Sequence, residues 1–382
     1  MRKPFWIVAS VIFADTLFYS AIAPLLPEYA QRFAFSDSMA GVLVGSYAIA
    51  NLLVALPSSG LVARIGIRPA LVAGLCLLAG SCLLFGFAPN AEVLVGARFV
   101  QGVGGALAWT AGIAWISADA GPSKRGAAIG GVVSAAVIGI IVGPAVGALA
   151  ASVGTGVVFS LVAALSLLLA GWCAAVPTPK PVGTRLREIL GRGRGALWLA
   201  VWLVTLPALL SGFLEVVLPL ELDELGATAL AIGAIFTASA AVEALISPLV
   251  GHASDRYGRL TPLRIGLFAT TILVALLGLA NSVPTVAIAL TLVFLALQLF
   301  WTPGMALVAD LSDYYGFGQS ITGALTNLAW AGGAAVGSLA GGGLAEAVGR
   351  GASWIVLVAI TGATAVFVFS RRRVLTGNVS GG

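Results

Sequence analysis

Three carboxylates, Asp15, Glu215 and Glu243, lie inside stretches of sequence that are otherwise apolar enough to cross a lipid bilayer. Moving an acidic side chain from water to the centre of a bilayer helix costs roughly 2.5 to 3.5 kcal/mol even on mild insertion scales. A medium of low dielectric favours the neutral acid, whereas a nearby cation favours the charged form. We therefore expect these residues to bind and release a proton or a cation.

Arg98 is the one basic residue expected within a span. It could form a fixed ion pair that steadies a helix crossing, or it could hold one carboxylate until the proton or substrate state changes. A static buried ion pair is costly to maintain, which favours the second interpretation. The candidate proton-coupling residues are Asp15, Glu215, Glu243 and Arg98.

Aromatic and neutral polar side chains also occur near the centres of the expected spans. An aromatic face within about 6 Å attracts an organic cation, although each ring could instead pack against lipid or neighbouring helices. Amide side chains could orient a ligand without adding charge. The candidate substrate-binding residues are Asp15, Tyr19, Asn51, Phe213, Glu215, Glu243, Gln298, Trp301, Asn327 and Trp330.

The elements that must position these residues are membrane helices. Hydrophobic residues make up 59% of the 382 residues and charged residues only 9%, which is typical of a polytopic membrane protein. Sheets with open edges cannot exist in lipid, so we expect an all-α membrane protein. Apolar runs of spanning length predict twelve transmembrane helices, at 5–27, 39–60, 70–88, 92–115, 127–150, 155–176, 197–220, 229–250, 262–281, 284–308, 318–343 and 352–370.

The basic residues predict the orientation of these spans. If the N-terminus is cytoplasmic, 17 of the 20 Lys and Arg residues fall in cytoplasmic segments, and Arg32 and Arg350 lie outside. Cytoplasmic loops carry such an excess, so both termini are expected in the cytoplasm. The net charge of +5 thus reflects topology, and nothing predicts a nucleic-acid partner.

A polar segment divides the chain into two similar halves. Residues 177–196 are rich in Pro, Gly and Arg and are expected to form a cytoplasmic linker between a six-helix half at 1–176 and another at 197–382. Similar loops follow the second and eighth spans, about 190 residues apart. Duplicated halves are a known transporter architecture, with a substrate site between them near the midplane.

Glycines recur every four residues in the fifth span, at Gly139, Gly143 and Gly147, beside Pro144. The eleventh span repeats the spacing at Gly333, Gly337 and Gly341. Small residues with this spacing let membrane helices approach closely. A seam on which one half rocks against the other is a compatible second interpretation.

These features together resemble the major facilitator superfamily over essentially the whole chain. Residues 251–259 fit the cytoplasmic loop signature G-x-x-x-D-R-x-G-R, Arg98 to Gly102 fits R-x-x-Q-G in the fourth span, and 139–147 is similar to the glycine–proline motif of the drug/proton antiporter branch. In the first half, Ala63 and Ser59 replace the Asp and the leading Gly of the loop signature. The resemblance implies gating loops that contain Arg64, Gly66, Arg68, Gly251, Asp255, Arg256, Gly258 and Arg259.

A narrower resemblance links the first and seventh spans to vesicular monoamine and acetylcholine transporters. Asp15 precedes Pro24-Leu-Leu-Pro27, and Glu215 precedes Pro219. In those relatives the carboxylates serve amine binding and proton exchange. Gln298 and Asn327 stand where the relatives carry acidic residues in the tenth and eleventh spans, and Glu243 is added in the eighth.

The expected function is proton-coupled antiport that exports organic cations, amphipathic amines or drugs by alternating access. The alternative is proton-coupled transport of a neutral metabolite such as a sugar, although sugars need more polar groups than the spans offer. A receptor or scaffold with an idle carrier fold would not need three intramembrane acids.

No phosphate loop, metal-ligand cluster or nucleophile with a base is present, so we expect no enzyme activity, no catalytic residues, no metal and no cofactor besides the proton gradient. The expected partners are a small cationic substrate, protons and the bilayer. A monomer in a bacterial inner membrane is the expected state.

Overall fold

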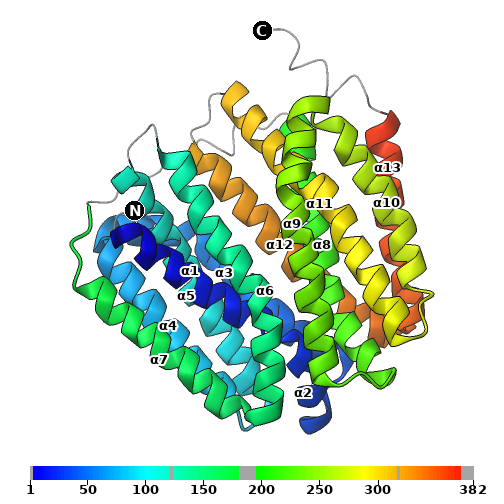
Figure 1. Cartoon of the computed structure of the whole chain (residues 1–382), viewed down its shortest axis with the longest axis horizontal. Helices are drawn as coiled ribbons and strands as arrows, with labels where there is room; N and C mark the ends of the chain where they lie inside the picture. Colours follow the sequence, from blue (N-terminus) through cyan, green and yellow to red (C-terminus); the bar gives the residue numbers. More distant parts are fainter. Residues whose placement is uncertain (1–2, 121–123, 180–194, 316–318, 371–382) are drawn as a thin grey trace. The chain divides into compact units, whose positions relative to one another are not determined.

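The computed structural model describes residues 3–120, 124–179, 195–315 and 319–370. Within these ranges all regular structure is helical, and twelve helices are long and apolar enough to cross a membrane. Figure 1 shows them coloured along the sequence. The prediction of an all-α protein with twelve spans is confirmed.

The first six spans are built from seven α-helices and one short 3-10 helix. They are α1 (Lys3–Ser20) continued by η1 (Ala23–Leu25) and α2 (Leu26–Arg32), then α3 (Asp37–Ile65), α4 (Ile67–Gly86), α5 (Ala91–Ala120), α6 (Arg125–Val153) and α7 (Thr155–Ala174). The second six are α8 (Gly195–Glu224), α9 (Ala229–Tyr257), α10 (Leu260–Leu277), α11 (Val283–Tyr314), α12 (Gln319–Val348) and α13 (Arg350–Ser370).

The chain divides into two compact units. One comprises Met1–Arg185 with Leu218–Thr237, and the other Leu186–Val217 with Ala238–Gly382. The end of α8 and the start of α9 therefore group with the first unit. A division of the chain at the linker would instead assign both segments to the second half. Most of the expected linker, at 180–194, lies outside the described residues, and its role stays a prediction.

The first span, expected at 5–27, is present at Lys3–Arg32 but is not one continuous α-helix. Helix α1 ends at Ser20, and the chain resumes through η1 and α2, which carry Pro24 and Pro27 near their first residues. A proline lacks the backbone N–H and clashes with the carbonyl four residues earlier. For Pro24 that carbonyl belongs to Ser20, the residue at which α1 ends.

The two loops after the second and eighth spans are much shorter than expected. Helix α3 continues to Ile65 and α4 begins at Ile67, while α9 continues to Tyr257 and α10 begins at Leu260. Gly66 and Gly258 have φ of 96° and 81°, which glycine adopts without the steric cost of a side chain. Each reversal is thus made at a glycine, and most residues of the two signatures lie on helix ends.

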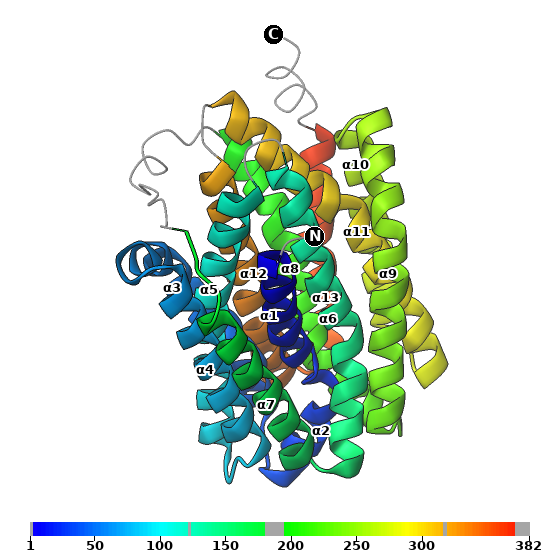
Figure 2. The same ribbon diagram turned by 60° about the vertical axis from the view of Figure 1, so that its left-hand side comes forward.

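Close helix contacts hold the carboxylate-bearing helices in both units. In the first unit α6 lies along α1, as Figures 1 and 2 show. A Cβ added at Gly139, Gly143 or Gly147 of α6 would meet backbone atoms of the α1 segment. In the second unit the same holds for Gly333 and Gly337 of α12 against α8.

The rest of the first unit packs around this pair. Helix α5 lies against α1, α3 and α4, and α7 lies against α4 (Figure 2). In the second unit α10 lies against α11 and α13. Helix α5 thereby brings Arg98 next to residues of α1 and α3.

Candidate functional site

Asp15 of α1 is completely buried among helices of the first unit. Its Oδ2 accepts hydrogen bonds from the Tyr47 hydroxyl on α3 at 2.9 Å and from the Trp109 indole N–H on α5 at 3.1 Å. Its Oδ1 is also buried and has no hydrogen-bond partner among the described residues. The two oxygens of this carboxylate therefore have different environments.

Gly105 of α5 provides the hollow in which Asp15 and Tyr47 meet. A Cβ at this position would lie 2.8 Å from the Tyr47 hydroxyl oxygen and 3.0 and 3.1 Å from the two carboxylate oxygens of Asp15. These separations are shorter than ordinary van der Waals contact, so a side chain at residue 105 would push the pair away from α5.

Arg98 of α5 lies in the same buried region and has none of its surface exposed. Its Nη1 donates to Gln101 Oε1 at 2.7 Å and to the Phe18 carbonyl oxygen at 3.5 Å. Its guanidinium carbon lies 6.0 Å from the ring centre of Phe18 and 5.5 Å from those of Tyr19 and Tyr47. Tyr47, which donates to Asp15, therefore also lies beside Arg98.

The structure therefore brings together three of the residues predicted in the first unit: Asp15, Tyr19 and Arg98. The rings of Tyr19 and Tyr47 are 4.8 Å apart. Asn51 is buried on α3 one turn beyond Tyr47, and residues four apart share a helix face. A substrate role for Asn51 stays a prediction.

The predicted acids of the second half lie on α8 and α9. Glu215 and Glu243 are both partly buried. Phe213 is completely buried and packs edge-on against Trp354 of α13, with ring centres 5.4 Å apart. This packing makes Phe213 a core residue of the second unit. A role for Phe213 in substrate binding stays a prediction.

A neutral polar cluster surrounds Gln298 of α11. Its side-chain amide donates to Ser247 Oγ of α9 at 2.6 Å and to Thr302 Oγ1 at 3.0 Å. The other predicted residues on this half, Trp301, Asn327 and Trp330, are partly buried on α11 and α12. Their roles in binding stay predictions.

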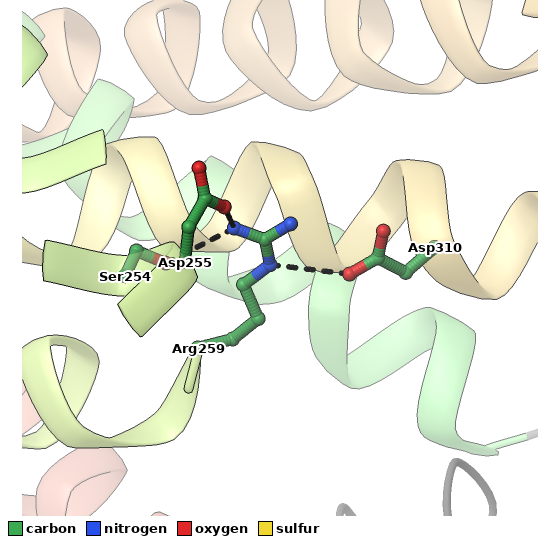
Figure 3. Close-up of polar contacts among 4 residues, drawn as sticks. All are labelled: Ser254, Asp255, Arg259 and Asp310. Atoms are coloured by element: carbon green, nitrogen blue, oxygen red, sulfur yellow. Dashed lines mark hydrogen bonds and ion pairs between the residues drawn. The ribbon is translucent and has the colours of Figure 1, made fainter. Parts of the chain in front are cut away.

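The second-half loop signature at 251–259 forms a compact ion-pair network, shown in Figure 3. Arg259 pairs with Asp255 through Nη1 and with Asp310 of α11 through Nε at 3.2 Å, and it also donates to Ser254 Oγ at 3.4 Å. Partial burial by itself lowers the pKa of Arg259, but the hydrogen bonds to Asp255 and Asp310 outweigh it and raise the pKa above its usual value. Arg259 thus ties the end of α9 to the end of α11.

The first-half signature has no equivalent network among the described residues. Arg64 and Arg68 lie at the end of α3 and the start of α4, and neither forms an ion pair with another described side chain. Ala63 occupies the position of the acid. The first-half loop therefore lacks an acidic side chain equivalent to Asp255, which pairs with Arg259 in the second half.

Trp109 is a residue of the Asp15 site that the sequence analysis missed. A signal for it exists, since Trp109-Thr110 recurs as Trp301-Thr302 at a distance of 192 residues. Thr110 shares a hydrogen bond with Ser58 of α3 at 2.8 Å, whereas Thr302 accepts one from Gln298 of its own helix. A comparison of the two halves would have selected Trp109 together with the predicted Trp301.

Known proteins place these features in one family. The model of the Major Facilitator Superfamily matches residues 8–214 and again 198–381. The chain belongs to the major facilitator superfamily. It is a membrane transporter and not an enzyme.

Within the superfamily the chain is similar to a multidrug resistance protein and to vesicular acetylcholine transporters. It is 29% identical over 166 residues to multidrug resistance protein 2 of Bacillus subtilis (strain 168), covering 44% of this chain and 42% of the relative. It is 31% identical over 192 residues to the probable vesicular acetylcholine transporter-B of Danio rerio, covering 48% and 38%. The chain thus spans about two fifths of the length of these curated relatives.

The fold itself is matched along its full length. The crystal structure of a bacterial homologue of the human lysosomal transporter Spinster, in an inward-facing and occupied conformation, superposes with a TM-score of 0.81 over 99% of both chains at 16% identity. At this identity the likeness concerns the fold. The all-helical transporter architecture is therefore shown.

Proposed function

We propose that the chain is a proton-coupled antiporter that exports organic cations, with Asp15 as the exchanging carboxylate. The observation that carries the proposal is the buried Asp15, whose Oδ2 is anchored by Tyr47 and Trp109 while Oδ1 has no hydrogen-bond partner in the part of the chain that the structure describes. An unpaired buried polar atom is costly, so a proton or a cationic donor at Oδ1 would stabilise the site.

Antiport follows if these two occupants exclude each other. Asp15 in the neutral acid form holds the proton, and an arriving ammonium group pairs with the carboxylate as that proton leaves. Low dielectric favours neutral Asp15 when no cation is present, and the cation favours the charged form. One site that cannot hold both partners couples their movements in opposite directions.

The aromatic surroundings favour a cation over a neutral solute. Tyr47 donates a hydrogen bond to Asp15, and the rings of Tyr47, Tyr19 and Phe18 lie within 6.0 Å of the neighbouring Arg98 guanidinium carbon. Aromatic faces attract cations by about 2 kcal/mol once water is removed. The named relatives include a multidrug resistance protein and a vesicular acetylcholine transporter, which agrees with this proposal. Glu215 and Glu243 are the further candidate proton sites.

Access would alternate by rocking of the two halves, as in duplicated transporters. The Arg259 network at the ends of α9 and α11 is proposed to break and reform in this cycle. A bacterial inner membrane with both chain termini in the cytoplasm remains the proposed location.

The decisive measurement is uptake of labelled organic cations into proteoliposomes with an acidic lumen. We expect uptake that disappears when the pH gradient is collapsed and that is abolished by Asp15→Asn, which keeps the shape of the side chain but cannot exchange a proton. Glu92→Gln is the matched control, because Glu92 is exposed at the start of α5 and its loss should leave uptake unchanged.

Two results would contradict the proposal. Gradient-driven uptake by Asp15→Asn at the rate of the unmodified protein would remove Asp15 from the coupling mechanism. Absence of gradient-dependent uptake for a broad panel of cations would instead favour proton-coupled transport of a neutral solute.

A further inference from the structure

The side chain of Arg98 is itself an organic cation inside an aromatic cage, defined here as the rings of Phe18, Tyr19 and Tyr47. Two of these rings come from α1 and one from α3, while Arg98 comes from α5. All three ring centres lie within 6.0 Å of the guanidinium carbon. At such distances an aromatic face attracts a cation.

The polar contacts of the guanidinium complete this environment. Gln101 Oε1 and the Phe18 carbonyl oxygen both accept hydrogen bonds from Nη1 of this guanidinium. A planar guanidinium can stack on rings and donate in its own plane at once, which a compact ammonium cannot do. Three aromatic rings together with two acceptors on one edge of the cation therefore suit a planar cationic group.

Other arginines near aromatic rings in the described structure lack these features. Arg32 lies 4.9 Å from the ring of Phe33, Arg256 lies 5.4 Å from that of Tyr257, and Arg264 lies 5.5 Å from that of Phe369. Arg32 and Arg256 are exposed, and Arg264 is only partly buried. Only Arg98, among the described arginines, combines complete burial with three rings.

We propose that the site beside Asp15 is a guanidinium-binding site whose resident ligand is the Arg98 side chain, and that cations bearing a guanidinium or amidinium group are the ligand class that fits it. A second consequence, which rests on the proposed function, is that a transported cation displaces Arg98 from the cage. Arg98 would then act as an internal competitor that keeps the site filled until substrate arrives.

The test uses the purified full-length Arg98→Ala variant, which lacks Cγ, Cδ and the guanidinium group. Ethylguanidinium supplies those missing atoms, and ethylammonium supplies the same chain and charge without the planar group. A ligand that binds only the folded protein raises its stability. We expect ethylguanidinium at about ten times its Kd to raise the apparent Tm of Arg98→Ala by roughly 2 °C or more, with little effect from ethylammonium.

The unmodified protein and Arg32→Ala are the matched controls. In the unmodified protein the cage is occupied, and Arg32→Ala removes an arginine from an exposed ring, so neither should respond to ethylguanidinium. Equal responses of Arg98→Ala to the two cations, or an equal response of Arg32→Ala, would overturn the proposal.

If Arg98→Ala does not fold in the absence of a cation, the test still applies. The yield of monodisperse Arg98→Ala protein after solubilisation with each cation then becomes the readout, and equal yields would again overturn the proposal. Rescue by ethylguanidinium without cation uptake by the unmodified protein would retain the guanidinium site and reject the proposed antiport. Cation uptake by the unmodified protein without rescue of Arg98→Ala would retain the proposed antiport and reject the guanidinium site.

Discussion

At the scale of single residues, the Asp15 site depends on the absence of a side chain at Gly105. The Tyr47 hydroxyl and the Asp15 carboxylate occupy the space that a Cβ of residue 105 would need. Gly96 lies on the same helix α5, but it is exposed, and a Cβ there would have no neighbour within 4 Å. Alanine substitutions at the two glycines therefore distinguish crowding at the Asp15 site from the higher helix propensity of alanine.

We expect Gly105→Ala to lower the free energy of unfolding by about 1 to 3 kcal/mol, because overpacking forces buried groups apart. Gly96→Ala should instead be neutral or stabilise by up to about 1 kcal/mol, since alanine favours the helix. Thermal unfolding of both purified variants measures the difference. Equal changes in the two variants would show that Asp15 and Tyr47 do not occupy the hollow at Gly105.

At the scale of helices, one packing device recurs in the two units. Glycines of α6 let α1 approach, and glycines of α12 let α8 approach. Hydrogen bonds from Ser20 to the Gly139 carbonyl and from Ser338 to the Gly212 carbonyl, each 3.3 Å long, cross the two contacts. Each contact therefore fixes a helix that carries a candidate carboxylate.

Gly143→Ala should destabilise the protein by about 3 kcal/mol, at the upper end of the usual cost of overpacking. The added Cβ would meet Ser20 Oγ and lie 2.5 Å from the Leu17 carbonyl oxygen, which is backbone and cannot rotate away. Gly130→Ala on the same helix, with nothing within 4 Å, is the control and should not destabilise. Thermal unfolding of the two variants in detergent checks the prediction, and similar Tm values for both would contradict it.

At the scale of the whole molecule, the duplication is recorded in the backbone. Residues with positive φ occur at corresponding positions of the two halves: Ala34 and Gly226, Gly66 and Gly258, and Gly154 and Gly349. After Ala34 the Phe35 N–H bonds to the Ala30 carbonyl, and after Gly226 the Ala227 N–H bonds to the Leu222 carbonyl. Both are the helix-ending arrangement in which glycine is preferred at the left-handed residue.

This correspondence predicts a reciprocal pair of substitutions. Ala34 has φ of 50°, so Ala34→Gly should stabilise by up to about 1 kcal/mol through release of left-handed strain. Gly226→Ala should destabilise by about 1 kcal/mol, since the new side chain would adopt the left-handed conformation. A Cβ at Gly226 meets no atom within 4 Å, so no steric clash adds to this cost. Chemical or thermal unfolding of the two variants should give shifts of opposite sign, and shifts of the same sign would refute the equivalence of the two turns.

Much of this organisation could be predicted from the sequence. The bilayer imposes a length and an apolar composition on every span, so the twelve spans and the helical class were readable without contacts. The cost of a charge in lipid made Asp15 and Arg98 recognisable as candidates. The spacing of Gly139, Gly143 and Gly147 likewise indicated close helix packing.

The tertiary structure decided which of these residues meet. Tyr47, Trp109 and Arg98 lie 32 to 94 positions from Asp15 along the chain, and only the packing of α5 on α1 and of α3 on α5 sets them near one carboxylate. It also decided that Arg98 fills the aromatic cage, that Phe213 packs in the core of its unit, and that α1 stops at Ser20. The position of a span depends on the free energy of transferring that one segment from water to lipid, so the composition of the segment predicts it. A site depends on contacts between segments, which the composition of one segment does not encode.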